Sequence, residues 1–152
     1  MAKFDSAEKL NLADIEITDV MTGDRDKRMF LYYQLIHSLK KAERVDIIVS
    51  FLMESGVKML LRELGNALDR GAKIRILTGN YLGITQPSAL YLIKQKLGDR
   101  VDLRFYNEKN RSFHPKSYIF HYADYSEIYI GSSNISRSAL TSGIEWNYRF
   151  RN

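Results

Sequence analysis

The 152-residue sequence contains no cysteine. This absence excludes disulfides, thiolate nucleophiles and every metal site that needs a cysteine ligand. No apolar run approaches the length of a membrane span, and no signal-peptide pattern is found. With only 2 prolines and 9 glycines, the composition is also unlike that of a low-complexity chain. We therefore expect one soluble, cytoplasmic, globular domain.

The net charge of +5 is unevenly distributed along the chain. Residues 1–26 hold 3 basic and 7 acidic groups, whereas residues 27–152 hold 20 basic and 11 acidic groups. A basic domain favours polyanionic partners, either nucleic acid or an anionic membrane surface. The simpler alternative is a solvated, lysine-rich surface without a partner.

Hydrophobic periodicity predicts an α/β domain over residues 27–152, preceded by an acidic arm over residues 1–26. In the arm, the alternation of Ile15, Ile17 and Val20 allows a short strand. The predicted helices cover residues 27–42, 56–71, 85–98 and 136–141. The predicted strands cover residues 44–51, 73–78, 101–105, 116–122, 125–131 and 144–150. This order predicts a mixed β-sheet sandwiched by helices, with an antiparallel hairpin in its second half.

The first motif that suggests chemistry is the pair His114 and Lys116. On a strand, side chains two residues apart point to the same face. The pair would present an imidazole nucleophile or base beside a fixed positive charge, which suits a phosphate group. The alternative is an ordinary strand edge with a solvated lysine, because His-x-Lys also occurs by chance.

The second motif is Gly131-Ser132-Ser133-Asn134, which follows a predicted strand and leads into a helix. Such a turn presents backbone N–H groups to an anion, and the serine hydroxyls and the Asn134 amide add further donors. The alternative is a helix N-cap formed by Ser133 or Asn134. On the last strand, Glu145 could orient His114 or form a salt bridge with an arginine.

Together these motifs resemble the phospholipase D superfamily, whose signature is His-x-Lys, then Asp, then Gly-Ser-x-Asn. The match covers five positions: His114, Lys116, Gly131, Ser132 and Asn134. Glu145 looks like the downstream carboxylate of the endonuclease branch of this superfamily.

The sequence departs from this signature at the aspartate. The family's Asp follows the lysine by five positions, where this sequence has His121. Asp124 has the family's spacing to Gly131 instead. Either the hairpin turn contains an insertion and Asp124 is the family's Asp, or the Asp is missing.

A narrower resemblance extends over most of the chain. It is to the N-terminal phospholipase D-like domain of large bacterial helicase and restriction-type proteins, in which a superfamily 2 helicase follows. The resemblance implies that the chain is a fragment of a longer protein, with a helicase domain in cis. It rests on the runs VSFLMESG (49–56), ILTGNY (76–81), FHPKSYIF (113–120), YIGSSNISRSAL (129–140) and GIEWN (143–147).

The resemblance implies phosphodiester cleavage without a metal or cofactor. His114 would be the nucleophile that forms a phosphohistidine, and Lys116, Asn134 and Ser132 would hold the phosphate oxygens. A second histidine must protonate the leaving group, so a symmetric dimer would complete the site. On a regular strand His121 points away from His114.

Other residues are weaker candidates for contacts with a substrate. His37 lies on a predicted helix and is more simply structural, and Arg137 could reach a phosphate or face solvent. Basic residues before His114 could extend a groove for a nucleic-acid backbone, namely Arg104, Lys109 and Arg111. Aromatic residues interleave with them and could stack on a base or belong to the core, namely Tyr106, Phe113 and Tyr118.

Three functions remain open at this point. The first is a dimeric, metal-independent nuclease domain that acts on DNA. The second is a non-catalytic DNA-binding and dimerisation module of a helicase. The third is a phospholipid hydrolase or phosphatidyl transferase, which the basic body and the lack of a lipid anchor favour least.

Overall fold

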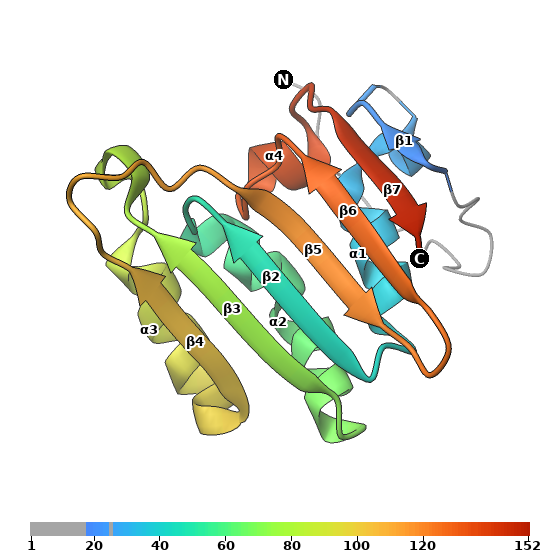
Figure 1. Ribbon diagram of the computed structural model, residues 1–152, viewed down its shortest axis with the longest axis horizontal. Coiled ribbons are helices and arrows are strands. Elements are labelled where there is room, and N and C mark those ends of the chain that lie inside the picture. The colour runs from blue at the N-terminus through green and yellow to red at the C-terminus, as the bar shows by residue number, and fades with distance from the viewer. Residues whose placement is uncertain (1–17, 25) are drawn as a thin grey trace, which may run out of the picture.

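The computed structural model describes residues 18–24 and 26–152, which form one seven-stranded mixed sheet with helices packed on it (Figure 1). The sheet order is β1-β7-β6-β5-β2-β3-β4. The strands are β1 (Val20–Met21), β2 (Arg44–Val49), β3 (Lys73–Gly79), β4 (Val101–Tyr106), β5 (Lys116–His121), β6 (Ser126–Gly131) and β7 (Asn147–Arg151). The α-helices are α1 (Leu31–Leu39), α2 (Glu54–Asp69), α3 (Pro87–Leu97) and α4 (Arg137–Thr141). Short 3-10 helices are η2 (Lys27–Met29), η3 (Tyr81–Gly83) and η4 (Gly98–Arg100).

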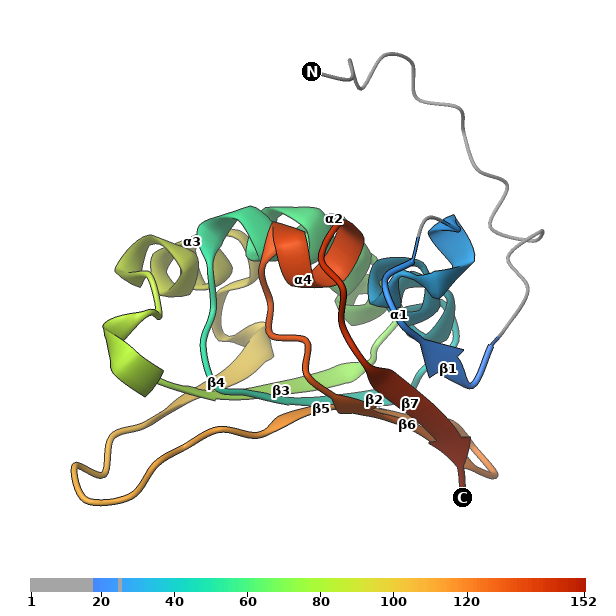
Figure 2. The same ribbon diagram turned by 90° about the horizontal axis from the view of Figure 1, so that it is seen from above.

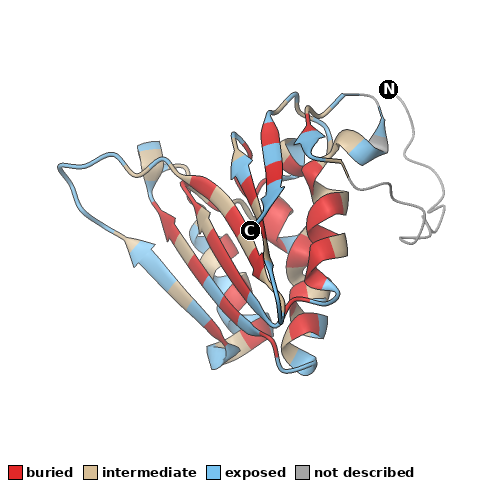
Figure 3. Ribbon diagram, turned by 45° about the vertical axis from the view of Figure 1, so that its right-hand side comes forward, coloured by how far each residue is buried: buried red, intermediate tan, exposed pale blue. Residues whose placement is uncertain are grey.

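The predicted order of helices and strands and the mixed α/β class are confirmed. Strands β2, β3 and β4 are parallel and are joined by α2 and α3, whereas β5, β6 and β7 are antiparallel. The apolar stripe of α2 that includes Val57, Leu60 and Leu64 is buried against the sheet, as its spacing requires. Figure 3 shows the buried residues concentrated in the central strands and in the helices that pack on them.

The helices differ from the prediction in one respect. In the described part of the chain, α1 to α4 all lie on the same face of the sheet, so the fold has two layers there instead of three (Figure 2). The connections explain this arrangement. Strands β2, β3 and β4 follow one another in a single direction across the sheet, and right-handed crossovers then place α2 and α3 on one side. We call the opposite face the open face.

The acidic arm contains a short strand, which the alternation in this segment had allowed. Val20 and Met21 form β1, which pairs with β7 at the edge of the sheet, and Met21 is fully buried. The arm therefore contributes a strand to the domain instead of only preceding it. Ile15 and Ile17, which suggested a strand, lie outside the described residues. No helix in the described ranges is both long and apolar enough to cross a membrane.

A buried polar cluster connects α1 to the carboxyl-terminal strands. The carboxylate of Glu127, 2% exposed, accepts hydrogen bonds from Ser38, Tyr122 and Arg151 at 2.7, 3.0 and 2.7 Å. The Ser38 hydroxyl also lies 2.8 Å from the Tyr129 hydroxyl. Burial alone would raise the pKa of Glu127, but these hydrogen bonds outweigh it and lower the pKa. The ionised Glu127 therefore stabilises this half of the fold.

Candidate active site

Strand pairing brings the two sequence motifs together at one edge of the sheet. β5 is antiparallel to both β2 and β6, so its first residue, Lys116, lies beside Val49 at the end of β2. The end of β6 reaches the same edge, where Gly131 pairs with Asn147 at the start of β7. The segments before β5 and after β6 therefore meet, although about fifteen residues of hairpin separate them along the chain.

His114 and Lys116 are in direct contact. The Lys116 Nζ lies 2.8 Å from the His114 Nε2 and donates to the His114 carbonyl oxygen at 3.1 Å. An ammonium group can only donate, so the contact requires a lone pair on Nε2. The ring of Tyr81 covers the imidazole with its centroid 4.4 Å away, and the Ser50 hydroxyl holds the Pro115 carbonyl at 3.2 Å. These contacts fix an exposed imidazole beside a buried ammonium.

The charge on Lys116 is influenced by two opposing effects. Burial lowers the pKa of Lys116, whereas the negative charge of Glu145 raises it. Because Lys116 is only 8% exposed, water provides little competition for its hydrogen bonds. The amine is therefore placed to hold an anion that binds at this edge.

Asn134 is buried at the same edge with its amide orientation fixed. Its Oδ1 accepts a hydrogen bond from the Phe51 backbone N–H at 3.2 Å, so its Nδ2 is the atom that can donate to a phosphate. The adjacent Ile135 forms a parallel bridge with Leu52, which ties the Asn134 turn to the end of β2. The cap of α4 is Ser136, whose hydroxyl accepts from the Ala139 N–H, so Asn134 is not used as a helix cap.

Ser132 and Glu145 form a second pair beside the first. The Ser132 hydroxyl donates a short hydrogen bond to the Glu145 carboxylate. The backbones are joined as well, because the Ser132 N–H donates to the Trp146 carbonyl and the Trp146 N–H donates to the Ser132 hydroxyl, both at 2.9 Å. The side-chain partner of Glu145 is therefore Ser132, whereas the sequence suggested His114 or an arginine. Glu145 still acts on Lys116 through its charge.

Steric crowding explains why the second motif has a glycine at position 131. A Cβ at Gly131 would lie 2.1 Å from the Trp146 carbonyl oxygen and 2.6 Å from the Asn147 Cα. No side chain fits there without separating β6 from β7. Gly131 therefore allows the Ser132 turn to approach the segment that carries Glu145. This segment lies just before β7, which begins at Asn147 and not at residue 144 as predicted.

The structure does not bring three of the predicted residues into contact with this site. Ser133 is fully buried, and its hydroxyl donates to the Ala139 carbonyl at 3.2 Å while accepting from Asn147 at 2.8 Å. Asp124 is exposed in the β5–β6 turn, at the opposite end of the hairpin from Lys116. Arg137 begins α4 and is exposed, with its N–H bonded to the Ser55 hydroxyl.

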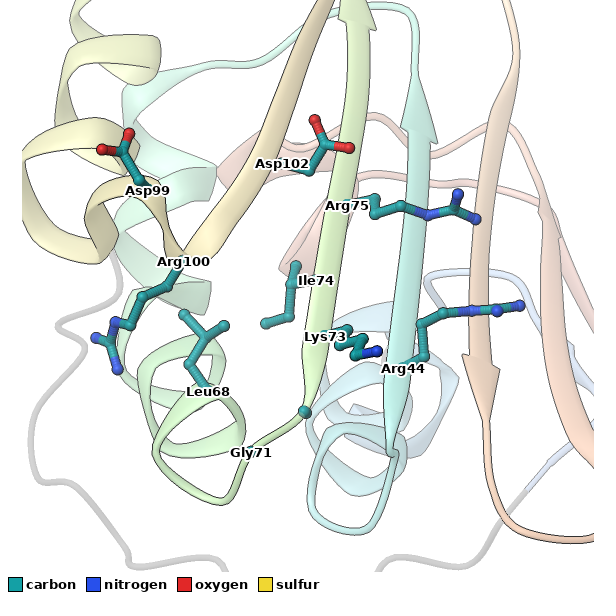
Figure 4. Close-up of a pocket in the computed structure, with 10 residues that line it drawn as sticks. Arg44, Leu68, Gly71, Lys73, Ile74, Arg75, Asp99, Arg100 and Asp102 are labelled. Carbon is teal, nitrogen blue, oxygen red and sulfur yellow. The ribbon is translucent and has the colours of Figure 1, made fainter.

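Two cavities lie at opposite ends of β3. One of about 410 Å³ is beside His114, lined by residues 80–82 and 106–113, and includes the stacked rings of Tyr106 and Phe113. The other, of about 540 Å³, opens at the amino ends of β2 and β3 (Figure 4). Its arginines include Arg44 and Arg75, both paired with Asp46. The site is therefore assigned to the His114 end of the sheet.

Comparison with known proteins identifies the family of this chain. The family described as "Cardiolipin synthase, PLD-like domain" matches residues 35–152. The chain belongs to the phospholipase D superfamily. The curated proteins contain no match to this chain.

Solved structures share the phospholipase D fold at low sequence identity. NucT from Helicobacter pylori superposes with a TM-score of 0.62 at 16% identity, over 86% of this chain and 82% of that chain. Phosphatidylserine synthase from Haemophilus influenzae Rd KW20 gives 0.63 at 14% identity, over 85% of this chain and 32% of that one. Polyphosphate kinase from Porphyromonas gingivalis gives 0.58 at 14% identity, over 90% and 20%. The present chain thus spans about a third or less of the last two.

The position five residues after Lys116, where the phospholipase D signature has an aspartate, holds a different residue in this chain. His121 occupies that position, at the far end of β5 and on the open face, where its Nε2 lies 3.0 Å from the Asp46 Oδ2 and its Nδ1 lies 2.9 Å from the Ser126 Oγ. The histidine therefore pairs with an acid from the neighbouring strand. His37 lies on α1 and is partly buried, and burial lowers its pKa.

The sequence interpretation overlooked two aromatic residues at this site. Tyr81 covers His114, and Trp146 is joined to Ser132 through its backbone. Both stand in runs that carried the resemblance, ILTGNY and GIEWN, so their positions offered a signal. Among residues 18–24 and 26–152, no group of three or more His, Asp or Glu side chains could hold a metal ion.

Proposed function

We propose that this chain is a metal-independent phosphodiesterase domain that cleaves DNA through a phosphohistidine, in a site completed by homodimerisation. The observation that carries the proposal is the 2.8 Å contact between the Lys116 Nζ and the His114 Nε2, beside the buried Asn134. This arrangement offers a nitrogen lone pair for attack together with donors for the phosphate oxygens.

The reaction would proceed in two displacements. The His114 Nε2 attacks phosphorus, the bond to the leaving oxygen breaks, and a general acid protonates that oxygen. Water then attacks the phosphohistidine, loses a proton to the same group, and releases His114 with a phosphate monoester as product. Lys116 and the Asn134 Nδ2 donate to the non-bridging oxygens in both steps, and a phosphate oxygen replaces Nε2 as the acceptor of the lysine.

The need for a second histidine as general acid is the reason for proposing a dimer. The sequence has 3 histidines, and His37 and His121 lie away from the site edge, on α1 and at the far end of β5. A second copy related by a two-fold axis would supply its own His114 as the acid. Ser132 and Glu145 would position the donors around the shared phosphate.

DNA is the favoured substrate because the body of the domain is basic. Arg104, Lys109 and Arg111 are exposed on β4 and on the loop that leads to His114, where they can contact a phosphate backbone. A helicase domain in cis, as the sequence resemblance implies, would deliver such a strand. Phosphatidyl transfer is the alternative that the family description and the synthase structure raise.

The deciding experiment incubates the protein with labelled single- and double-stranded DNA in EDTA. We expect cleavage that is lost in His114→Ala and retained in His121→Asn, a matched histidine outside the site. Binding without cleavage at every protein concentration would support the non-catalytic module instead. Turnover of a phosphatidyl substrate but not of DNA would support the lipid alternative.

A mixing experiment tests the shared site. When His114→Ala protein replaces part of the wild type at a constant total protein concentration, mixed dimers hold one His114 side chain and are inactive. Activity should then fall with the square of the wild-type fraction. A linear fall would show that each copy works alone.

A further inference from the structure

The open face carries an exposed aromatic strip along β7. Side chains alternate on this strand, with Asn147 and Arg149 buried and Tyr148 and Phe150 exposed at 54% and 37%. Trp146, which precedes Asn147 and continues the alternation, is 69% exposed. Same-face residues on a strand lie about 6.6 Å apart. The rings of Tyr148 and Phe150 are near-parallel at 22°, with centroids 6.4 Å apart.

The strip begins at the phosphate-binding turn. Both backbone polar groups of Trp146 are hydrogen-bonded to Ser132, so the backbone of Trp146 adjoins a residue proposed to hold the phosphate. Ile130, which is 51% exposed, pairs with Tyr148 and widens the apolar surface onto β6. Within the described residues, no helix covers this surface (Figure 2).

The other half of the open face carries positive charge. Strand register places Arg44, Lys73, Arg75 and Arg104 on this face of β2, β3 and β4, together with two carboxylates, Asp46 and Asp102. Arg44, Lys73 and Arg75 come from adjacent strands at one end of the sheet (Figure 4). A shallow cavity of about 230 Å³ runs between Asp46, Arg75 and Arg104. The cations outnumber the acids on this half of the face.

We propose that the open face binds single-stranded nucleic acid, with Trp146 stacking on an unpaired base next to the scissile phosphate. The inference rests on the proposed function for its substrate class and adds the strand preference. Exposed aromatic side chains on a sheet surface beside cations are the means by which proteins hold unpaired bases. A duplex hides its base faces, so the aromatic strip would contribute little to binding double-stranded DNA.

The chain provides a direct probe, because Trp146 is its only tryptophan. His114→Ala protein, which holds strands without cutting them, would be titrated with a thymidine oligonucleotide, an abasic strand of equal length, and a duplex. We expect saturable quenching of the tryptophan emission by the thymidine strand and little change with the abasic strand or the duplex.

Labelled-strand anisotropy would test the side chain itself. In the same background, Trp146→Ala should weaken single-strand binding roughly five- to 100-fold, and Trp146→Phe should retain most of it. Tyr91→Ala removes an aromatic side chain that is 75% exposed on α3, and it should bind as well as its parent.

Equal affinity for the abasic and thymidine strands, or unchanged emission on strand binding, would overturn the inference. So would an emission shift that follows protein concentration without nucleic acid, which would show that a second copy covers the strip. The two proposals fail separately: quenching without any cleavage by wild type would refute the nuclease alone. Cleavage by wild type together with unimpaired strand binding by Trp146→Ala would refute only the proposal that the aromatic strip binds single strands.

Discussion

The Lys116 Nζ contacts the His114 Nε2 at 2.8 Å, although His114 lies in the loop before β5 and Lys116 is the first residue of that strand. The imidazole is exposed and the amine is buried, so the pair spans the boundary between solvent and core. A phosphate that reaches the imidazole therefore meets a donor from which water is largely excluded.

Removing this donor should affect catalysis more than folding. Lys116→Met keeps the length of the side chain, and we expect the cleavage rate to fall about 10²–10³-fold, as when one donor to a developing charge is lost. Thermal stability should stay the same or rise, because a buried charge is costly. Single-turnover cleavage and thermal unfolding measure the two effects. Lys96→Met, on the exposed side of α3, is the control and should cleave like wild type. A cleavage rate of Lys116→Met within threefold of wild type would contradict the catalytic role of Lys116.

Gly131→Ala should destabilise the fold. Its Cβ would meet the Trp146 carbonyl oxygen at 2.1 Å, so β6 and β7 must separate at a cost of about 1–3 kcal/mol. Gly65→Ala is the matched control, because its Cβ would find only ordinary contact at 3.8 Å in the middle of α2. That change should stabilise by about 0.5–1 kcal/mol. Urea unfolding measures the free energy of unfolding of both variants. Equal changes in the two variants would refute the steric explanation for Gly131.

Glu127 should make stability depend on pH. Its folded-state pKa is lowered below the ordinary value of 4.5. The stability that the ionised group contributes is therefore complete above pH 4.5 and is lost as pH falls through the lower folded-state pKa. Glu127→Gln should cost about 2–4 kcal/mol at pH 7, because its partners remain buried, and should flatten the acid limb of the curve. An acid limb identical to that of wild type would contradict this assignment.

The altered signature position gives a further prediction. His121→Asp would restore the family's residue but place a second carboxylate against Asp46, 3.0 Å from the present imidazole nitrogen. Like charges at that distance should lower the unfolding temperature without raising cleavage. Asp124→Ala should leave both unchanged, because Asp124 is exposed in the distant turn. Loss of cleavage in Asp124→Ala would revive its role as the family's aspartate.

Much of the fold could be predicted from apolar patterns, because the runs that become β3 and α2 bury one face each and the run that becomes β2 is buried almost throughout. The spacing also indicated His114, Lys116 and Asn134. The pairing of His121 with Asp46 could not be predicted, because it depends on the register between strands 75 residues apart. The inward turn of Ser133 was missed for a similar reason, since the side chain that holds it, Asn147, comes from another strand.

The β5–β6 hairpin places the strand register that the site needs at one end and an exposed turn at the other. Its open end holds Lys116 in register with β2 and Gly131 in register with β7. Its closed end, Ala123 and Asp124, is exposed at the opposite end of the hairpin. Residues added or removed at the closed end leave the register at the open end untouched. Length changes within such domains should therefore accumulate in this turn, and a short peptide tag inserted there should be tolerated by a working enzyme.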